Sequence, residues 1–163
     1  MIKIIYEGEG RPSRDEYFLA MAQLVSLRGT CARRKTGCVL VDKNGFVIGT
    51  GYNGRPSGAA HCSSGFFCKG YDQPSGQGLD LCEAIHAEAN ALLQCKNTQE
   101  IVTAYCTHSP CIHCVKLLQN TSCRNIVFAH RYAHDSVSKE LWEREPMLGR
   151  SWTYYDMERG CRT

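Results

Sequence analysis

The chain has 163 residues, with 19 basic against 16 acidic side chains and a formal net charge of +3. Hydrophobic residues make up 43% and charged residues 21%, a composition that fits one folded domain and excludes wholesale disorder. The small net charge gives no ground for nucleic-acid binding, and no apolar run is long enough to span a bilayer. No secretory signal is recognisable, so we expect a cytoplasmic protein, or one of the host cytoplasm if the chain is viral.

The first predicted element is a helix that begins at a capping box, Ser13 with Glu16 three residues later. Apolar residues at helical spacing follow as far as Gly29, which ends the pattern. Two short β-rich runs come next, at 38–41 and 46–51. The Asp-Lys-Asn-Gly segment between them predicts a hairpin, because Asn-Gly favours the turn that joins antiparallel strands.

Residues 53–82 form a Gly- and Ser-rich stretch without periodicity. A loop this long is improbable in a compact domain unless it is functional or stapled. Beyond it, strands and helices alternate, which predicts a single domain over 1–163 with helices packed on a partly parallel sheet. The predicted elements of this half are helices at 83–95, 111–120 and 136–145 and strands at 101–106, 125–129 and 152–155.

Cysteine is the unusual feature of the composition, with eleven in the chain beside six histidines. Without a secretion signal the thiols should be reduced, and their clustering then favours metal binding over disulfides. Five fall in apolar patterns or near the C-terminus, and we expect these to be ordinary buried thiols: Cys38, Cys95, Cys106, Cys123 and Cys161.

Two separated motifs carry the chemistry, His86-Ala87-Glu88 at a helix start and Pro110-Cys111-Ile112-His113-Cys114 where a turn enters a helix. One His and two Cys are the ligands of a catalytic zinc whose fourth position stays open. Cysteines three residues apart on the first turn of a helix face the same way, and the amides exposed there favour thiolates.

Glu88 is placed for proton transfer and not for ligation. An H-x-E motif followed by P-C-x-x-C is the known signature of zinc deaminases. Two other interpretations stay open from the residues alone: a closed structural zinc site, and a helix glutamate that faces water. A purely structural site has no need of a carboxylate beside an open metal.

Four blocks of the sequence resemble deoxycytidylate deaminases of the cytidine-deaminase-like superfamily: TCARRKTGCVLV (30–41), GTGYNGRPSGAAHC (49–62), CEAIHAEANAL (82–92) and SPCIHC (109–114). The resemblance implies a three-layer α/β/α sandwich around a five-stranded mixed sheet. It also implies hydrolytic deamination of dCMP to dUMP, with zinc on His86, Cys111 and Cys114 and with Glu88 transferring protons.

The same resemblance implies further site residues. Asn53 and Tyr132 would contact the nucleotide together with Ala87 of the HAE block. Turn chemistry alone would also account for Asn53, and a surface aromatic for Tyr132. The basic run Arg33-Arg34-Lys35 would either neutralise a substrate phosphate or form a solvated face.

A second, structural zinc is implied on Cys31, Cys62, Cys68 and Cys82, with His61 as a substitute ligand, and it would staple the loop at 53–82. The alternative is four unrelated thiols on a mobile lid.

Relatives of this branch are commonly hexamers regulated by dCTP and dTTP, which implies a homo-oligomer with effector contacts at Gly54 and Arg55. Other enzymes that share the motifs, tRNA adenosine deaminases and riboflavin-pathway deaminases, are the alternative activities. A non-catalytic, zinc-stabilised interaction module is the alternative of another class.

Overall fold

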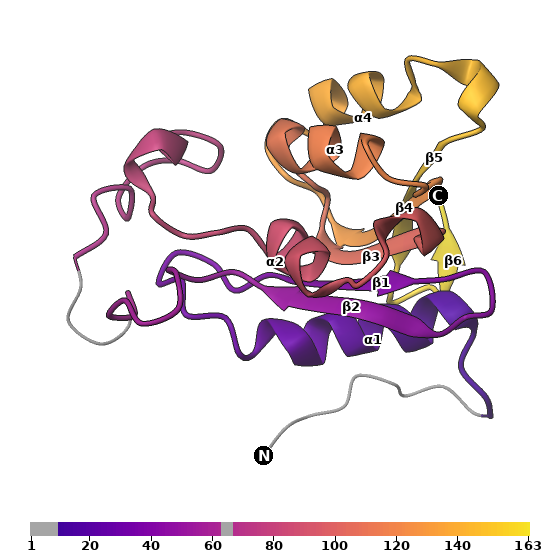
Figure 1. Ribbon diagram of the computed structural model, residues 1–163, viewed down its shortest axis with the longest axis horizontal. Coiled ribbons are helices and arrows are strands. Elements are labelled where there is room, and N and C mark those ends of the chain that lie inside the picture. Colours follow the sequence, from indigo (N-terminus) through magenta and orange to yellow (C-terminus); the bar gives the residue numbers. More distant parts are fainter. Residues whose placement is uncertain (1–9, 63–66) are drawn as a thin grey trace.

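A computed structural model describes residues 10–62 and 67–163 (Figure 1), so parts of the predicted domain and of the predicted loop lie outside the described residues. Short 3₁₀ turns lie at Leu79–Leu81, Thr98–Glu100 and Pro146–Leu148. The helices and strands in chain order are α1 (Arg14–Ser26), β1 (Gly37–Val41), β2 (Val47–Tyr52), α2 (Ala87–Gln94), β3 (Thr103–His108), α3 (Ile112–Gln119), β4 (Asn125–His130), α4 (Asp135–Glu143), β5 (Ser151–Asp156) and β6 (Cys161–Arg162).

The strands form one mixed sheet in the order β2-β1-β3-β4-β5-β6. β1 runs antiparallel to β2 and β3, whereas β3, β4 and β5 are parallel to one another. Each of the five expected strands is present. The sixth, β6, pairs antiparallel with β5 over two residue pairs. The expected five-stranded sheet is therefore corrected to six strands, because a two-residue strand is too short to leave a periodic pattern in the sequence.

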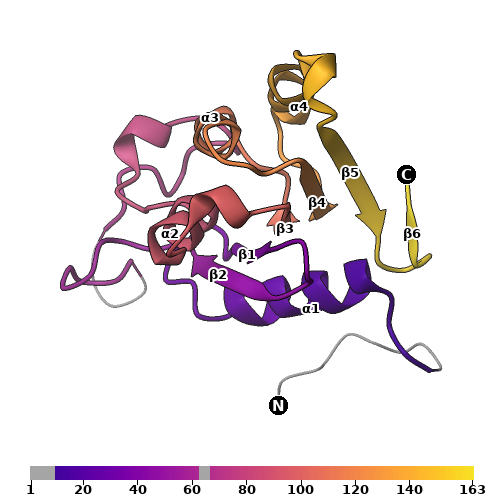
Figure 2. The same cartoon turned by 45° about the vertical axis from the view of Figure 1, so that its right-hand side comes forward.

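Helices cover both faces of the sheet, as expected for an α/β/α sandwich (Figures 1 and 2). Side chains of β1 alternate between the faces. Val39 and Val41 pack with Phe18 and Leu19 of α1. Leu40 points the other way, into the larger core cluster beneath α2, α3 and α4.

The five cysteines expected to be buried in apolar surroundings differ in their exposure to solvent. Cys38, Cys106 and Cys123 are fully buried in the larger core cluster. Cys95 is only half-buried, and Cys161 is exposed on β6. The expectation of burial was therefore wrong for Cys161, whose strand lies at the edge of the sheet.

α2 begins at Ala87 and not at 83 as predicted. Ile85 is held out of the helix because it pairs with Gly54 in an antiparallel bridge, with N···O distances of 2.8 and 3.1 Å. The helix then crosses β2 at Gly51, where a Cβ would collide with the carbonyl oxygen of Ala87. The missing side chain lets the start of α2 lie against the end of β2.

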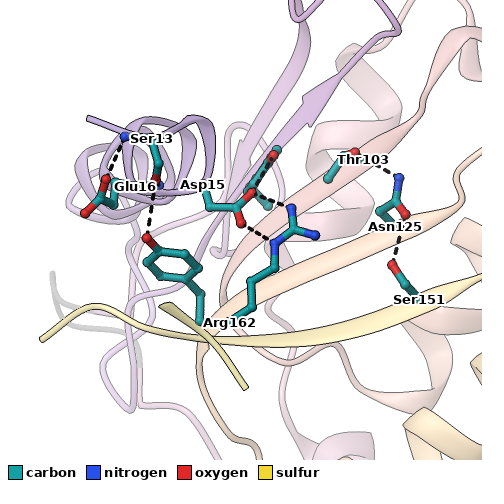
Figure 3. A network of polar contacts seen from close by, with 9 residues as sticks. Ser13, Asp15, Glu16, Thr103, Asn125, Ser151 and Arg162 are labelled. Carbon is teal, nitrogen blue, oxygen red and sulfur yellow. Dashed lines mark hydrogen bonds and ion pairs between the residues drawn. The ribbon is translucent and has the colours of Figure 1, made fainter. Parts of the chain in front are cut away.

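The buried carboxylate of Asp15 fastens the C-terminus onto α1 (Figure 3). It accepts hydrogen bonds from the Tyr105 hydroxyl (3.0 Å) and from Nε of Arg162 (2.6 Å).

The predicted capping box is also present, since Ser13 and Glu16 exchange hydrogen bonds at the start of α1. Within the described ranges, no helix combines the length and the apolar character needed to cross a membrane.

Candidate active site

A pocket of about 440 Å³ lies at the end of the sheet where β1 begins and β3 ends. The segment before β1, the residue after β2 and the turn between β3 and α3 form its walls. The long segment after β2, which extends beyond this end of the sheet (Figure 1), contributes Tyr71, Ser75, Gly76 and Leu79. Parallel strands bring their carboxyl ends together at one edge, which is where open α/β sheets hold ligands.

His86, Cys111 and Cys114 meet at one corner of this pocket. His86 is the N-cap of α2 and Cys111 the N-cap of α3, while Cys114 lies on the first turn of α3. Nδ1 of His86 is 3.3 Å from the sulfur of Cys111 and 3.4 Å from that of Cys114. Among the described residues, this is the only group of three or more His, Cys, Asp or Glu whose ligand atoms all lie within 4.8 Å of one another.

The electrostatics of this corner favour a thiolate. The pKa of Cys111 is lowered to about 3, first because the Cys114 thiol hydrogen-bonds to its sulfur and also because of the bond and charge of His86. The pKa of His86 is raised to about 9, mainly by its hydrogen bond to Cys111. A borderline nitrogen and two soft sulfurs in this arrangement are a donor set that fits zinc. His113 is exposed on the same helix, outside this group.

Glu88 lies beside the three candidate ligands, on the first turn of α2, and lines the same pocket. Only 8% of the residue is exposed. Burial raises the pKa of its carboxyl group, and the positive charge of His86 opposes that rise. A buried carboxyl group that faces a pocket is therefore present where the sequence analysis expected one, and Glu88 does not face water.

The three residues expected to contact a nucleotide all line the pocket: Asn53, Ala87 and Tyr132. The Asn53 side chain accepts a hydrogen bond from the Thr36 amide (2.9 Å) and donates one to the Arg34 carbonyl (2.7 Å). Asn53 thus fixes the backbone that precedes β1. The backbone amide of Tyr132 donates to the Ser109 hydroxyl (2.8 Å), which fixes Tyr132 beside the β3–α3 turn.

Tyr132 lies between two parts of the pocket. Burial raises the pKa of its hydroxyl and the charge of Cys111 raises it further, whereas Arg33 and Arg34 oppose the rise. The Tyr132 side chain is therefore within electrostatic range of both the thiol corner and the basic run. Gly76 lies against it, since a Cβ there would be 2.9 Å from the Tyr132 hydroxyl oxygen.

The other four candidate zinc ligands, Cys31, Cys62, Cys68 and Cys82, form a looser group. Cys31 and Cys68 are buried and the other two half-buried. Burial raises the pKa of the Cys82 thiol, and the neighbouring Cys68 and Cys31 thiols raise it further. Burial also raises the pKa of the Cys62 thiol, and the same two neighbours raise it further. In the described residues, no three of these sulfurs lie within 4.8 Å of one another.

The two residues expected to contact an effector already have structural contacts. Gly54 forms the bridge to Ile85. The Arg55 guanidinium donates to the Glu83 carboxylate at 2.6 and 3.0 Å and to the Ala60 carbonyl at 2.6 Å. These bonds tie the turn after β2 to the segment that leads into α2.

His108, the last residue of β3, also lines the pocket and was not among the site residues predicted from the sequence. Its ring packs against that of His130 at the end of β4, with 5.0 Å between the centroids and 39° between the ring planes. Burial lowers the pKa of His108 to about 4, and the charges of Arg34 and His130 add to this effect. The signal that was available is its place at the carboxyl end of a predicted parallel strand.

A profile of the cytidine and deoxycytidylate deaminase zinc-binding region matches residues 12–130. A deoxycytidylate deaminase of Mycobacterium phage D29 is 43% identical over 125 residues, which cover 72% of this chain and 95% of the phage protein. A deoxycytidylate deaminase of Schizosaccharomyces pombe is 39% identical over 135 residues, covering 80% of this chain and 41% of the yeast protein.

Among solved structures, dCMP deaminase from the cyanophage S-TIM5 in complex with dCMP and dUMP is similar over 88% of this chain and 97% of that chain. The sequence identity is 26% and the TM-score 0.65. The chain therefore belongs to the zinc-binding cytidine and deoxycytidylate deaminase family. It spans almost the whole mycobacteriophage relative and less than half of the fission yeast relative.

Proposed function

We propose that the protein catalyses the hydrolytic deamination of dCMP to dUMP with release of ammonia. The observation that carries this proposal is the buried carboxyl group of Glu88, which opens on the same pocket as His86 and Cys111. A closed structural site would need neither that carboxyl group nor the pocket. The relatives named deoxycytidylate deaminase favour this substrate over the adenosine and riboflavin-pathway alternatives.

His86, Cys111 and Cys114 are the residues that would hold the catalytic zinc, and zinc in this site supplies Lewis-acid activation of the attacking water. Glu88 accepts a proton as water adds to C4 of the cytosine ring and delivers it to ring nitrogen N3. The carboxyl group then assists protonation of the amine that leaves C4 as ammonia. Its fixed place on the first turn of α2 provides the positioning that such proton transfer needs.

Asn53, Ala87 and Tyr132 form the nucleotide-binding wall in this proposal. An amide carries two N–H groups and an oxygen with two lone pairs. Asn53 therefore keeps hydrogen-bonding capacity for the sugar after it has bonded to Thr36 and Arg34. Tyr132 supplies both a ring surface and a hydroxyl group to the same pocket.

The direct test measures ammonia release by the zinc-loaded protein from dCMP, cytidine, dCTP and adenosine-containing RNA. We expect dCMP to be the preferred substrate. Release from the adenosine-containing RNA alone would instead assign the site to adenosine deamination, and no release from any of the four would contradict the proposed function.

We further propose two zinc ions per chain, the second held by Cys31, Cys62, Cys68 and Cys82. The charges of Cys31 and Cys68 act on both the Cys62 and the Cys82 thiols, which supports this proposal. Three of the four cysteines lie in the long segment after β2, and Cys31 lies before β1, so a shared ion would join the two segments. Metal analysis of protein purified without chelator should give two zinc ions per chain, and Cys62→Ala should lower the ratio toward one. A ratio of one that Cys62→Ala leaves unchanged would remove the structural site.

A homo-oligomer regulated by dCTP and dTTP at the turn of Gly54 and Arg55 is the last part of the proposal. An effector phosphate would have to take the place of Glu83 at Arg55. Steady-state kinetics on dCMP with each triphosphate, on the native chain and on Arg55→Ala, test the regulation, and light scattering gives the subunit number. Hyperbolic curves that neither triphosphate changes would leave this turn with its structural bonds only.

A further inference from the structure

The three cations of the run at 33–35 have different partners. Nη2 of Arg33 donates to the carbonyl oxygens of Gln73 (2.7 Å) and Pro74 (2.9 Å). Nζ of Lys35 donates to the Leu27 carbonyl at 3.3 Å, and Lys35 does not line the pocket. Two of the three cations are thus engaged with the backbone.

Arg34 differs from Lys35 in its place and from Arg33 in its hydrogen bonds. Both arginines line the pocket, but the Arg34 side chain has one hydrogen bond to another described residue, a long contact of 3.5 Å from Nη2 to the Ser75 hydroxyl. A guanidinium group has five N–H donors in a planar fork that matches phosphate oxygens. Arg34 therefore brings to the pocket a positive charge that no described carboxylate neutralises, together with N–H donors that have no acceptor among the described residues.

The pocket is ordered from a buried reactive corner to an exposed basic end. Glu88 and Cys111 are buried at the corner, Tyr132 is half-buried, and Arg34 is exposed. The charges of Cys111 at the corner and of Arg34 at the basic end both act on the Tyr132 hydroxyl. A nucleotide has the same order of parts, because the base carries the reacting carbon, the sugar comes next and the phosphate is the charged end.

On this basis we propose that the guanidinium of Arg34 binds the phosphate of the nucleoside monophosphate and makes the pocket selective for nucleotides over nucleosides. The inference rests on the proposed deamination of dCMP and adds the residue that recognises the phosphate. It divides the basic run by role: Arg34 contacts the ligand, Arg33 holds the segment at 73–74, and Lys35 stays outside the pocket.

His108 supports this division. The Thr107 hydroxyl oxygen accepts from the Gly37 amide (3.1 Å) and lies 3.2 Å from Nδ1 of His108. His108, with a pKa of about 4, adds no positive charge at neutral pH. The positive charge of this end of the pocket therefore comes from Arg33 and Arg34, and Nη2 of Arg33 already donates to two carbonyl oxygens.

The test compares Arg34→Gln with the matched control Lys35→Gln, which makes the same charge change one residue away. For Arg34→Gln we expect KM for dCMP to rise about tenfold to hundredfold, the usual effect of losing a hydrogen-bonded charge, with kcat little changed. KM and kcat for deoxycytidine should stay as in the native chain. Lys35→Gln should leave all four constants unchanged, and Arg34→Lys should restore part of the affinity for dCMP.

Two outcomes would overturn the role of Arg34 while the proposed function stands: an unchanged KM for dCMP in Arg34→Gln, or an equal rise in both glutamine variants. If the native chain does not deaminate dCMP, the proposed function fails. Calorimetry then tests the role of Arg34 separately, by comparing how tightly dCMP and deoxycytidine bind. Tighter binding of dCMP that is lost in Arg34→Gln supports the phosphate contact, and binding that this substitution leaves unchanged refutes it.

Discussion

The Glu88 carboxyl group is buried on the first turn of α2 and lines the pocket. The charged groups that act on it are the candidate zinc ligands His86 and Cys111, and it hydrogen-bonds to Cys114. Burying an ionisable group costs free energy. Such a cost is characteristic of a functional position, where strain or desolvation serves the chemistry.

Replacing Glu88 with Gln should therefore abolish turnover and spare the fold. The amide has nearly the same size but cannot take up and release the proton. We expect kcat for dCMP to fall by at least about a hundredfold, the usual magnitude for loss of a general acid–base group, while zinc content stays unchanged. Metal analysis checks the unchanged zinc content, and steady-state kinetics on the same preparation check the fall in kcat.

Glu140→Gln, an exposed position on α4, is the matched control and should keep native kinetics. A zinc-replete Glu88→Gln protein with near-native activity would contradict the assigned role.

Individual elements were predictable where a local pattern decides them. The capping box at Ser13 and the Asn-Gly turn need only neighbouring residues, so their elements formed as expected. The start of α2 was predicted four residues early, because Ile85 is held by a bridge to Gly54, far away in the sequence. The His86, Cys111 and Cys114 group could be anticipated because both motifs fall at helix starts beside one sheet edge.

The contacts of the long segment could not be anticipated. Arg33 donates to two main-chain carbonyl oxygens, and a carbonyl oxygen is offered by every residue type. No sequence pattern therefore identifies the partner of Arg33 or distinguishes its role from that of Arg34.

Arg33→Gln should loosen the segment around Gln73 and Pro74. The backbone hydrogen bonds of this segment close turns within it, such as the bond from the Tyr71 amide to the Cys68 carbonyl oxygen at 2.9 Å. We expect amide hydrogen exchange over 70–79 to accelerate, with little change elsewhere, because a local opening needs less free energy than global unfolding.

Hydrogen-exchange mass spectrometry measures this change, and Arg144→Gln, which makes the same substitution at an exposed site on α4, is the control. Native exchange rates over 70–79 in Arg33→Gln would show that other contacts hold the segment.

At the scale of the whole molecule, one buried carboxylate joins segments that lie far apart in the sequence. The Asp15 carboxylate links α1, β3 and β6 by bonding to Tyr105 and Arg162, which lie 90 and 147 residues further along the chain. Burial and the Asp15 carboxylate raise the pKa of the Tyr105 hydroxyl, so it stays a hydrogen-bond donor at neutral pH. This link explains why so short a strand as β6 is held against the fold.

Asp15→Ala should lower the free energy of unfolding by about 1–3 kcal/mol, because it leaves the buried Tyr105 hydroxyl without an acceptor and releases Arg162. Part of that cost is the penalty of the unpaired hydroxyl. In a Tyr105→Phe background the hydroxyl is absent, so we expect the same Asp15→Ala change to cost less, by about 1 kcal/mol. Urea unfolding of the native chain, both single variants and the double variant closes this cycle. Additive costs would mean that Asp15 stabilises the fold through Arg162 alone, and that the hydroxyl of Tyr105 finds another acceptor when Asp15 is removed.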